Sequence, residues 1–199
     1  GFSDAQVPFY DPRAWDVTLQ ILTDLKPNIL VSNGDFFDFP SGSLKFSPRS
    51  YKGKHPEAFR DQITLGRGLL AQLPKPVEGQ RRIWNDGNHE WRWFRLLVHD
   101  PQIYQLLQLP ELASAENLFQ LLNLAQYGFE YSGEYPNGTW LFGIGDPTTD
   151  VWVEHGYIAS KHAGYTGQRL RDERGANVVM GHVERLALNW RQYVGGRWL

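Results

Sequence analysis

The sequence contains no cysteine, which excludes a disulfide framework, a thiolate zinc site and a cysteine nucleophile. No apolar run approaches the ~18 residues of a membrane span, and no signal peptide is visible, so we expect no membrane partner. The charge is almost balanced, at a net −2, which gives the chain no overall attraction to nucleic acid or anionic membranes. With 41% hydrophobic and 21% charged residues, the composition is that of a soluble globular protein.

The length of 199 residues favours one domain with a substantial core. No repeat, low-complexity tract or linker divides the chain, so we expect a single domain over residues 1–199. A domain trimmed at one or both ends is the alternative, because only Gly1-Phe2-Ser3 precedes the first candidate site residue, Asp4. The eight tryptophans are interpreted as packing residues of the core and grooves.

Hydrophobic periodicity predicts an α/β first half and a β-rich second half. The first half is expected to hold helices over 13–25, 56–73, 91–107 and 116–124, and strands over 29–32 and 81–85. Beyond residue 130, strands are expected over 139–144, 151–154, 178–180 and 186–194, with one helix over 159–173. This order favours two sheets packed together with helices outside.

Two of the predicted strands end in a glycine that is followed by polar side chains. The strand over 29–32 leads into Gly34-Asp35 and then Asp38, and the strand over 81–85 leads into Gly87-Asn88-His89-Glu90. Asn33-Gly34 and Asp86-Gly87 are also common hairpin turns, but no second alternating strand follows either pair. In α/β folds, ligands bind beyond the carboxyl ends of strands. The pattern therefore indicates a metal-dependent hydrolase.

Two histidines follow later strands. His155 ends the apolar strand over 151–154, and His182 follows the strand over 178–180. If that last strand continued, His182 and Glu184 would share one face, because side chains alternate along a strand. Each histidine alone could be structural, but the ordered series is hard to explain by chance.

The ordered series resembles the calcineurin-like metallophosphoesterase superfamily. The pattern of that superfamily runs Asp-x-His, Gly-Asp-x-x-Asp, Gly-Asn-His-Asp/Glu, His and Gly-His-x-His. The matching segments here are 4–6, 34–38, 87–90, His155 and 181–184. The variant with glutamine in the first motif is similar to members from phages and bacteria. The resemblance implies a four-layer α/β/β/α sandwich of two mixed β-sheets flanked by helices, with the metals at the sheet ends.

The resemblance also implies a role for each matching residue. Asp35 would bridge two divalent metal ions, completed on one side by Asp4, Gln6 and Glu184 and on the other by Asn88, His155 and His182. His89 would protonate the leaving oxygen or steady the phosphoryl group, and Asp38 would hydrogen-bond His89. The implied activity is hydrolysis of phosphate mono- or diesters by metal-activated water. Two cations would offset the charge that repels an attacking hydroxide.

Gln6 and Glu184 depart from the pattern, since each stands where the superfamily has a histidine. The first metal would then be held by oxygen atoms alone, and such sites suit Mg²⁺, Mn²⁺ or Ca²⁺ rather than Zn²⁺. We therefore expect Mn²⁺ or Mg²⁺ to support activity better than Zn²⁺. The alternative is a catalytically impaired relative that binds nucleic acid or a protein partner.

The long loop over 39–55 is basic and carries interleaved aromatic residues, among them Lys45 and Arg49. It could grip a polyanion, so nucleic acid is a candidate substrate beside small phosphate esters; a solvated basic loop is the other interpretation. His162 is a candidate phosphate contact or a surface histidine. Arg82 and Arg92 are interpreted first as surface charges and second as phosphate contacts.

The resemblance places the protein in the cytoplasm of a bacterial or phage-infected cell, and the absence of cysteine fits that reducing compartment. The substrate is expected to be its main partner. A homodimer is a further candidate, because an uncovered edge strand invites pairing with a second copy.

Overall fold

The structure is a computed structural model that describes residues 1–40, 56–92, 117–142, 150–162, 164–183 and 187–188. In chain order, its elements are α1 (Pro12–Leu25), β1 (Ile29–Asn33), α2 (Pro56–Leu70), β2 (Arg81–Asn85), α5 (Leu118–Leu121), the 3₁₀ helix η4 (Leu124–Tyr127), β3 (Phe129–Tyr131), β4 (Gly138–Leu141), β5 (Val151–Glu154), α6 (Tyr165–Arg174) and β6 (Asn177–Met180). The strand expected over 186–194 and most of the helix expected over 91–107 lie outside the described residues. None of the described helices is long and apolar enough to cross a membrane.

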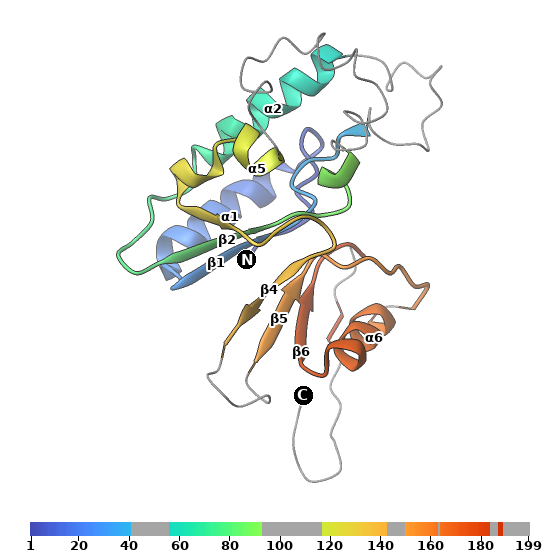
Figure 1. Cartoon of the computed structure of the whole chain (residues 1–199). Coiled ribbons are helices and arrows are strands. Elements are labelled where there is room, and N and C mark those ends of the chain that lie inside the picture. The colour runs from blue at the N-terminus through green and yellow to red at the C-terminus, as the bar shows by residue number, and fades with distance from the viewer. Residues whose placement is uncertain (41–55, 93–116, 143–149, 163, 184–186, 189–199) are drawn as a thin grey trace.

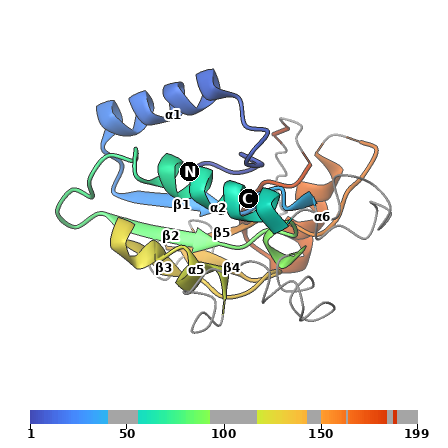
Figure 2. The same cartoon turned by 90° about the horizontal axis from the view of Figure 1, so that it is seen from above.

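The elements form two three-stranded sheets that are flanked by helices. In the first sheet β1, β2 and β3 run parallel; in the second, β5 pairs antiparallel with β4 and parallel with β6. Helices α1, α2 and α5 lie on one side of the first sheet, the second sheet lies on the other side, and α6 flanks the second sheet (Figures 1 and 2). The predicted α/β sandwich is confirmed. Among the described strands, only the second sheet is mixed.

Local signals explain why α1 forms where the sequence predicts it. The carboxylate of Asp11 accepts a hydrogen bond from the Arg13 N–H, and Pro12 occupies the first helical turn, where its missing N–H costs nothing. The helix ends at Lys26, whose left-handed φ of 44° lets its N–H bond to the Leu22 carbonyl. Trp15 is the buried residue that anchors α1 to the core.

Strands β1 and β2 are buried on both faces from their second residue onward. Leu30 and Trp84 belong to the large core beneath the helices, where Trp84 contacts Phe36 and Phe129 edge to face. Val31 and Ile83, which alternate with them, form a second cluster between the sheets with Val153 of β5. The last residues of both strands are therefore held rigidly from two sides.

Two predicted helices differ clearly in extent, and one strand was not predicted. The helix expected over 116–124 is divided, because Asn123 adopts a left-handed φ of 50° between α5 and η4. The helix expected from residue 159 begins only at Tyr165, after Gly164 with φ 79°. The three-residue strand β3 is too short to show alternation. Left-handed residues at these points depend on context that hydrophobic periodicity does not contain.

Candidate metal centre

The two glycine-containing motifs lie side by side at the carboxyl ends of β1 and β2. These strands are parallel and in register, with Asn33 opposite Asn85. Neither Asn33-Gly34 nor Asp86-Gly87 is therefore a hairpin turn. A Cβ added to Gly87 would lie 2.2 Å from Asp35 Oδ1, so the two loops approach more closely than any side chain would allow. Glycine at this position brings Asp35 against the backbone of the second motif.

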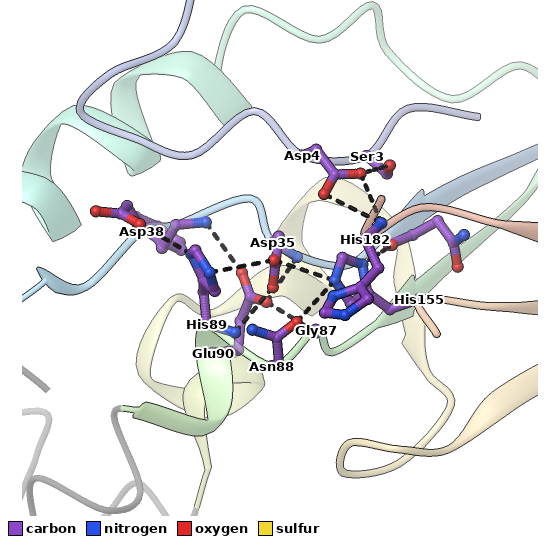
Figure 3. A network of polar contacts seen from close by, with 12 residues as sticks. Ser3, Asp4, Asp35, Asp38, Gly87, Asn88, His89, Glu90, His155 and His182 are labelled. Atoms are coloured by element: carbon purple, nitrogen blue, oxygen red, sulfur yellow. Dashed lines mark hydrogen bonds and ion pairs between the residues drawn. The ribbon is translucent and has the colours of Figure 1, made fainter. Parts of the chain in front are cut away.

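Ligand-type atoms converge around Asp35 (Figure 3). Asp35 Oδ2 lies 3.0 Å from Nε2 of His155, and Asn88 Oδ1 lies 3.2 Å from the same nitrogen. Asp35, His155 and His182 each offer an atom within 4.8 Å of the others. Asp35 and His155 are only 2% and 1% exposed. A buried carboxylate, an amide oxygen and two imidazoles of this kind fit a divalent cation.

The backbone around His155 favours ligation through Nε2. Its Nδ1 lies 2.9 Å from the Asn33 carbonyl oxygen, which can only accept the Nδ1–H, so Nε2 is the ring nitrogen that faces Asp35. Metal-binding histidines commonly use such a carbonyl to fix their tautomer. In the metal-free protein, burial would lower the pKa of His155, but the hydrogen bond and charge of Asp35 outweigh burial and raise the pKa to about 9. In the metal-free protein the raised pKa of His155 and the lowered pKa of Asp35 favour a pair of opposite charges, at a place where a cation could join the two groups.

The other acid–base groups shift according to the same contacts. Burial would raise the pKa of Asp35, yet the hydrogen bond and charge of His155 and the charge of His89 lower it. Burial and the neighbouring charge of His155 lower the pKa of His182. Burial raises the pKa of Asp4 despite its hydrogen bonds to Ser3 and His182. These opposed shifts are typical of a functional site.

The N-terminal segment runs alongside β1 and brings Asp4 and Gln6 to the centre. The Asp4 N–H bonds to the Gly34 carbonyl at 3.0 Å, and the Gln6 N–H bonds to the Asp35 carbonyl at 2.9 Å. The carboxylate of Asp4 also accepts the His182 N–H at 3.2 Å. Residues from opposite ends of the chain therefore meet at one point.

Four of the predicted ligands have left-handed backbone conformations. Their φ values are 56° at Asp4, 52° at Gln6, 51° at Asp35 and 71° at His182. Such conformations are uncommon outside glycine and cost roughly 1–3 kcal/mol each, and they cluster at functional sites. His182 therefore does not continue β6, which ends at Met180, so the condition under which His182 and Glu184 would share one strand face is not met. The loop turns there because the His182 N–H is directed to Asp4.

His89 and Asp38 lie on the other side of Asp35. His89 Nδ1 lies 2.9 Å from Asp38 Oδ1, and its Nε2 lies 3.6 Å from Asp35 Oδ2. Its backbone N–H donates to Asp35 Oδ1 at 2.8 Å. Burial would raise the pKa of Asp38, but the neighbouring His89 and Arg92 lower it. The imidazole is thus held between two carboxylates.

Glu90 has a larger structural role than the sequence indicated. Its Oε2 accepts the N–H groups of Asp35 and Gly87, both at 2.8 Å, and its Oε1 accepts the Phe37 N–H at 3.0 Å. One carboxylate therefore ties the two loops together. Burial, reinforced by the charges of Asp35 and Asp86, raises the pKa of Glu90 to about 8.

Two arginines depart from their first interpretation as surface charges, and Arg92 lies where the second interpretation, a phosphate contact, would place it. Arg92 contacts Asp38 and His89 within the site, rather than standing on the surface. The sequence contained one signal for the contact with His89: Arg92 follows it by three residues, and residues three apart on a helical turn share a face. Arg82 is only 3% exposed, and its guanidinium donates to Gln80 and to the carbonyls of Pro74 and Tyr127. Its interpretation as a surface charge is wrong, because it points inward from a strand covered on both faces.

The remaining candidates lie apart from the cluster or outside the described residues. His162 is exposed in the loop before α6, where its N–H bonds to Ser160 Oγ. Glu184, Lys45 and Arg49 fall outside the described residues, so the oxygen-rich first metal site is described only at Asp4, Gln6 and Asp35.

The family model of the calcineurin-like phosphoesterases matches residues 2–196. The chain belongs to this family, and the predicted superfamily is confirmed. Membership indicates a metal-dependent phosphoesterase. No curated protein and no solved structure matches the chain.

Proposed function

We propose that the protein hydrolyses phosphate mono- or diesters at a centre of two divalent metal ions. The observation that carries this proposal is the convergence of Asp35, Asn88 and His155 at 3.0–3.2 Å, with His182 beside them. These four residues follow four different strands, and the carbonyl of Asn33 supports the tautomer of His155 that metal binding needs. The family match supports the same chemistry.

Asp35 would join the two ions, because it is central to the cluster and can offer two oxygens. Asn88, His155 and His182 would hold one ion, and Asp4, Gln6 and Glu184 the other. The ions would neutralise the phosphate charge and supply an activated water.

His89 would act on the side of Asp35 away from His155. Its Nδ1 faces Asp38, and its Nε2 is the ring nitrogen nearer Asp35. From there it would protonate the leaving oxygen or steady the phosphoryl group. A positioned general acid contributes about 10²–10⁴ in rate.

Hydrolysis by chelator-stripped protein, with Mn²⁺, Mg²⁺ or Zn²⁺ added back, tests the function and the metal preference together. A bis-aryl phosphate, an aryl monophosphate and short single-stranded DNA separate diesterase, monoesterase and nuclease activity. We expect turnover with Mn²⁺ or Mg²⁺ that exceeds turnover with Zn²⁺, because the Asp4 side of the centre is rich in oxygen.

The variant Asn88→Ala should lose metal binding and activity together, whereas His89→Gln should retain metal and lose about 10²–10⁴ in rate. Asp16→Asn, which alters an exposed carboxylate on α1, serves as the control. No bound metal and no turnover at saturating Mn²⁺ would support the catalytically impaired relative instead. A clear preference for Zn²⁺ would contradict the proposed metal preference.

A further inference from the structure

We propose that Arg92 is a phosphate-binding residue of this centre, which exchanges its contact with His89 for the phosphoryl group when substrate binds. The inference rests on the proposed function, and it adds a residue that the family pattern in the sequence does not include. It follows from what the Arg92 guanidinium touches, how far it is buried and which donors it can offer.

The guanidinium of Arg92 is divided between the two partners of the acid–base pair. Its Nη1 donates to the Asp38 carbonyl at 2.6 Å and to Asp38 Oδ1 at 3.1 Å. Its Nη2 contacts His89 Nε2. The side chains of Arg92, Asp38 and His89 are 19%, 14% and 14% exposed. Arg92 is therefore largely enclosed, with part of its side chain exposed.

The contact between Arg92 and His89 cannot persist during catalysis. The Nη2 group lies against Nε2, which is the ring nitrogen turned away from Asp38, so in the free protein Arg92 occupies the nitrogen that would face a leaving oxygen. His89 can protonate a leaving oxygen only from an Nε2 that carries a proton and is free of Arg92. The Nη2 group consequently needs another acceptor in the reacting complex.

A phosphoryl oxygen is the acceptor that suits this place. It is anionic, it must come close to His89 for proton transfer, and the planar fork of arginine matches phosphate geometry. Because Nη1 is anchored on Asp38, the guanidinium needs only to shift Nη2 from the imidazole to the substrate. Because Asp38 already holds the Arg92 side chain in place, phosphate binding should lose little further side-chain entropy.

Binding of inorganic phosphate to the Mn²⁺-loaded full chain, measured by calorimetry, tests this inference independently of turnover. The variant Arg92→Ala should weaken phosphate binding by about 10–100-fold, and KM should rise with it. Arg92→Lys keeps the positive charge but lacks the planar guanidinium. Its phosphate affinity should therefore fall between those of the wild type and Arg92→Ala. Arg81→Ala is the matched control, because Arg81 pairs with Glu130 at the opposite end of β2.

Measuring the Mn²⁺ affinity of the same variants distinguishes a failure of this inference from a failure of the proposed function. It should be nearly unchanged in Arg92→Ala, since arginine does not ligate cations. Phosphate affinity equal to that of the wild type, with only kcat reduced, would overturn the inference and leave Arg92 as a positioning residue for Asp38. A wild-type chain that binds neither Mn²⁺ nor phosphate would overturn the proposed function and this inference together. If Arg92→Ala does not fold, Arg92→Lys decides the outcome by the same measurement.

Discussion

Individual residues at the centre are held in conformations and contacts that their side chains alone would not favour. Asp35 combines a left-handed backbone with a carboxylate that is 2% exposed. Its strain is offset locally, because its N–H donates to Glu90 and its Oδ1 accepts the His89 N–H. The close approach at Gly87 belongs to the same arrangement. These contacts fix the position of the Asp35 carboxylate before any ligand binds.

The variant Gly87→Ala should destabilise the protein by about 1–3 kcal/mol and weaken Mn²⁺ binding, because the new Cβ would lie 2.4 Å from the Asp35 backbone nitrogen. Neither partner is the free end of a long side chain, so the loops must separate. Chemical denaturation and calorimetry measure the two effects.

Gly68→Ala is the matched control for this substitution. Gly68 is exposed in α2, and a Cβ there would meet nothing within 4 Å. Removing a helical glycine should stabilise the protein by roughly 0.5–1 kcal/mol. Equal effects of the two substitutions would show that close approach at Gly87 is unimportant.

At the scale of elements, the centre depends on how the two sheets are joined. Asn85 donates to Asn33 Oδ1 at 2.9 Å and to the Val153 carbonyl at 3.0 Å, and Asn33 donates to the Glu154 carbonyl at 2.9 Å. These buried amides connect the ends of β1 and β2 to the end of β5. They lie directly before the loops that carry Asp35, Asn88 and His155, and so set the relative position of those side chains.

Asn85→Ala should cost about 1–3 kcal/mol of unfolding free energy, because it leaves the Asn33 amide oxygen and the Val153 carbonyl buried without this donor. It should also reduce Mn²⁺ affinity, since β5 carries His155. Urea denaturation should show a lower midpoint with an unchanged slope. The exposed Asn28→Ala is the comparison, and a similar midpoint for both variants would contradict the role of the amide bridge.

For the whole molecule, the centre draws on segments from Asp4 to His182, so metal binding should be linked to global stability. The charged pair of Asp35 and His155 at its middle is buried, with Nε2 and Oδ2 3.0 Å apart. A ligand that binds the folded state alone stabilises it by mass action. The unfolded chain cannot assemble ligands separated by so many residues.

Mn²⁺ at 100 times its dissociation constant should therefore raise the free energy of unfolding by about 2.7 kcal/mol, and chelator should reverse the gain. Thermal denaturation with and without Mn²⁺ measures this difference. His182→Ala should lose most of the shift, while Asp16→Asn should retain it. A wild-type midpoint that does not respond to Mn²⁺ would argue against a metal centre formed by these residues.

Much of the fold could be predicted because its signals are local. The signals for β1, β2, β5 and α1 are contained in short stretches of sequence, and the structure confirms these four elements. Three features could not be predicted: the short strand β3, the start of α6 at Tyr165 rather than at residue 159, and the burial of the Arg82 side chain. Each depends on packing partners or on left-handed residues that a periodic pattern does not reveal.

The sequence by itself determined the family and the order of the strand-end motifs, because residue type and spacing carry both. Only the tertiary structure decided that His155 faces Asp35 across the sheets, that Glu90 joins two loops, and that Arg92 reaches Asp38. The reason is physical: these contacts join residues distant along the chain. Their geometry is fixed by sheet packing and by backbone turns such as that at His182, not by local preference.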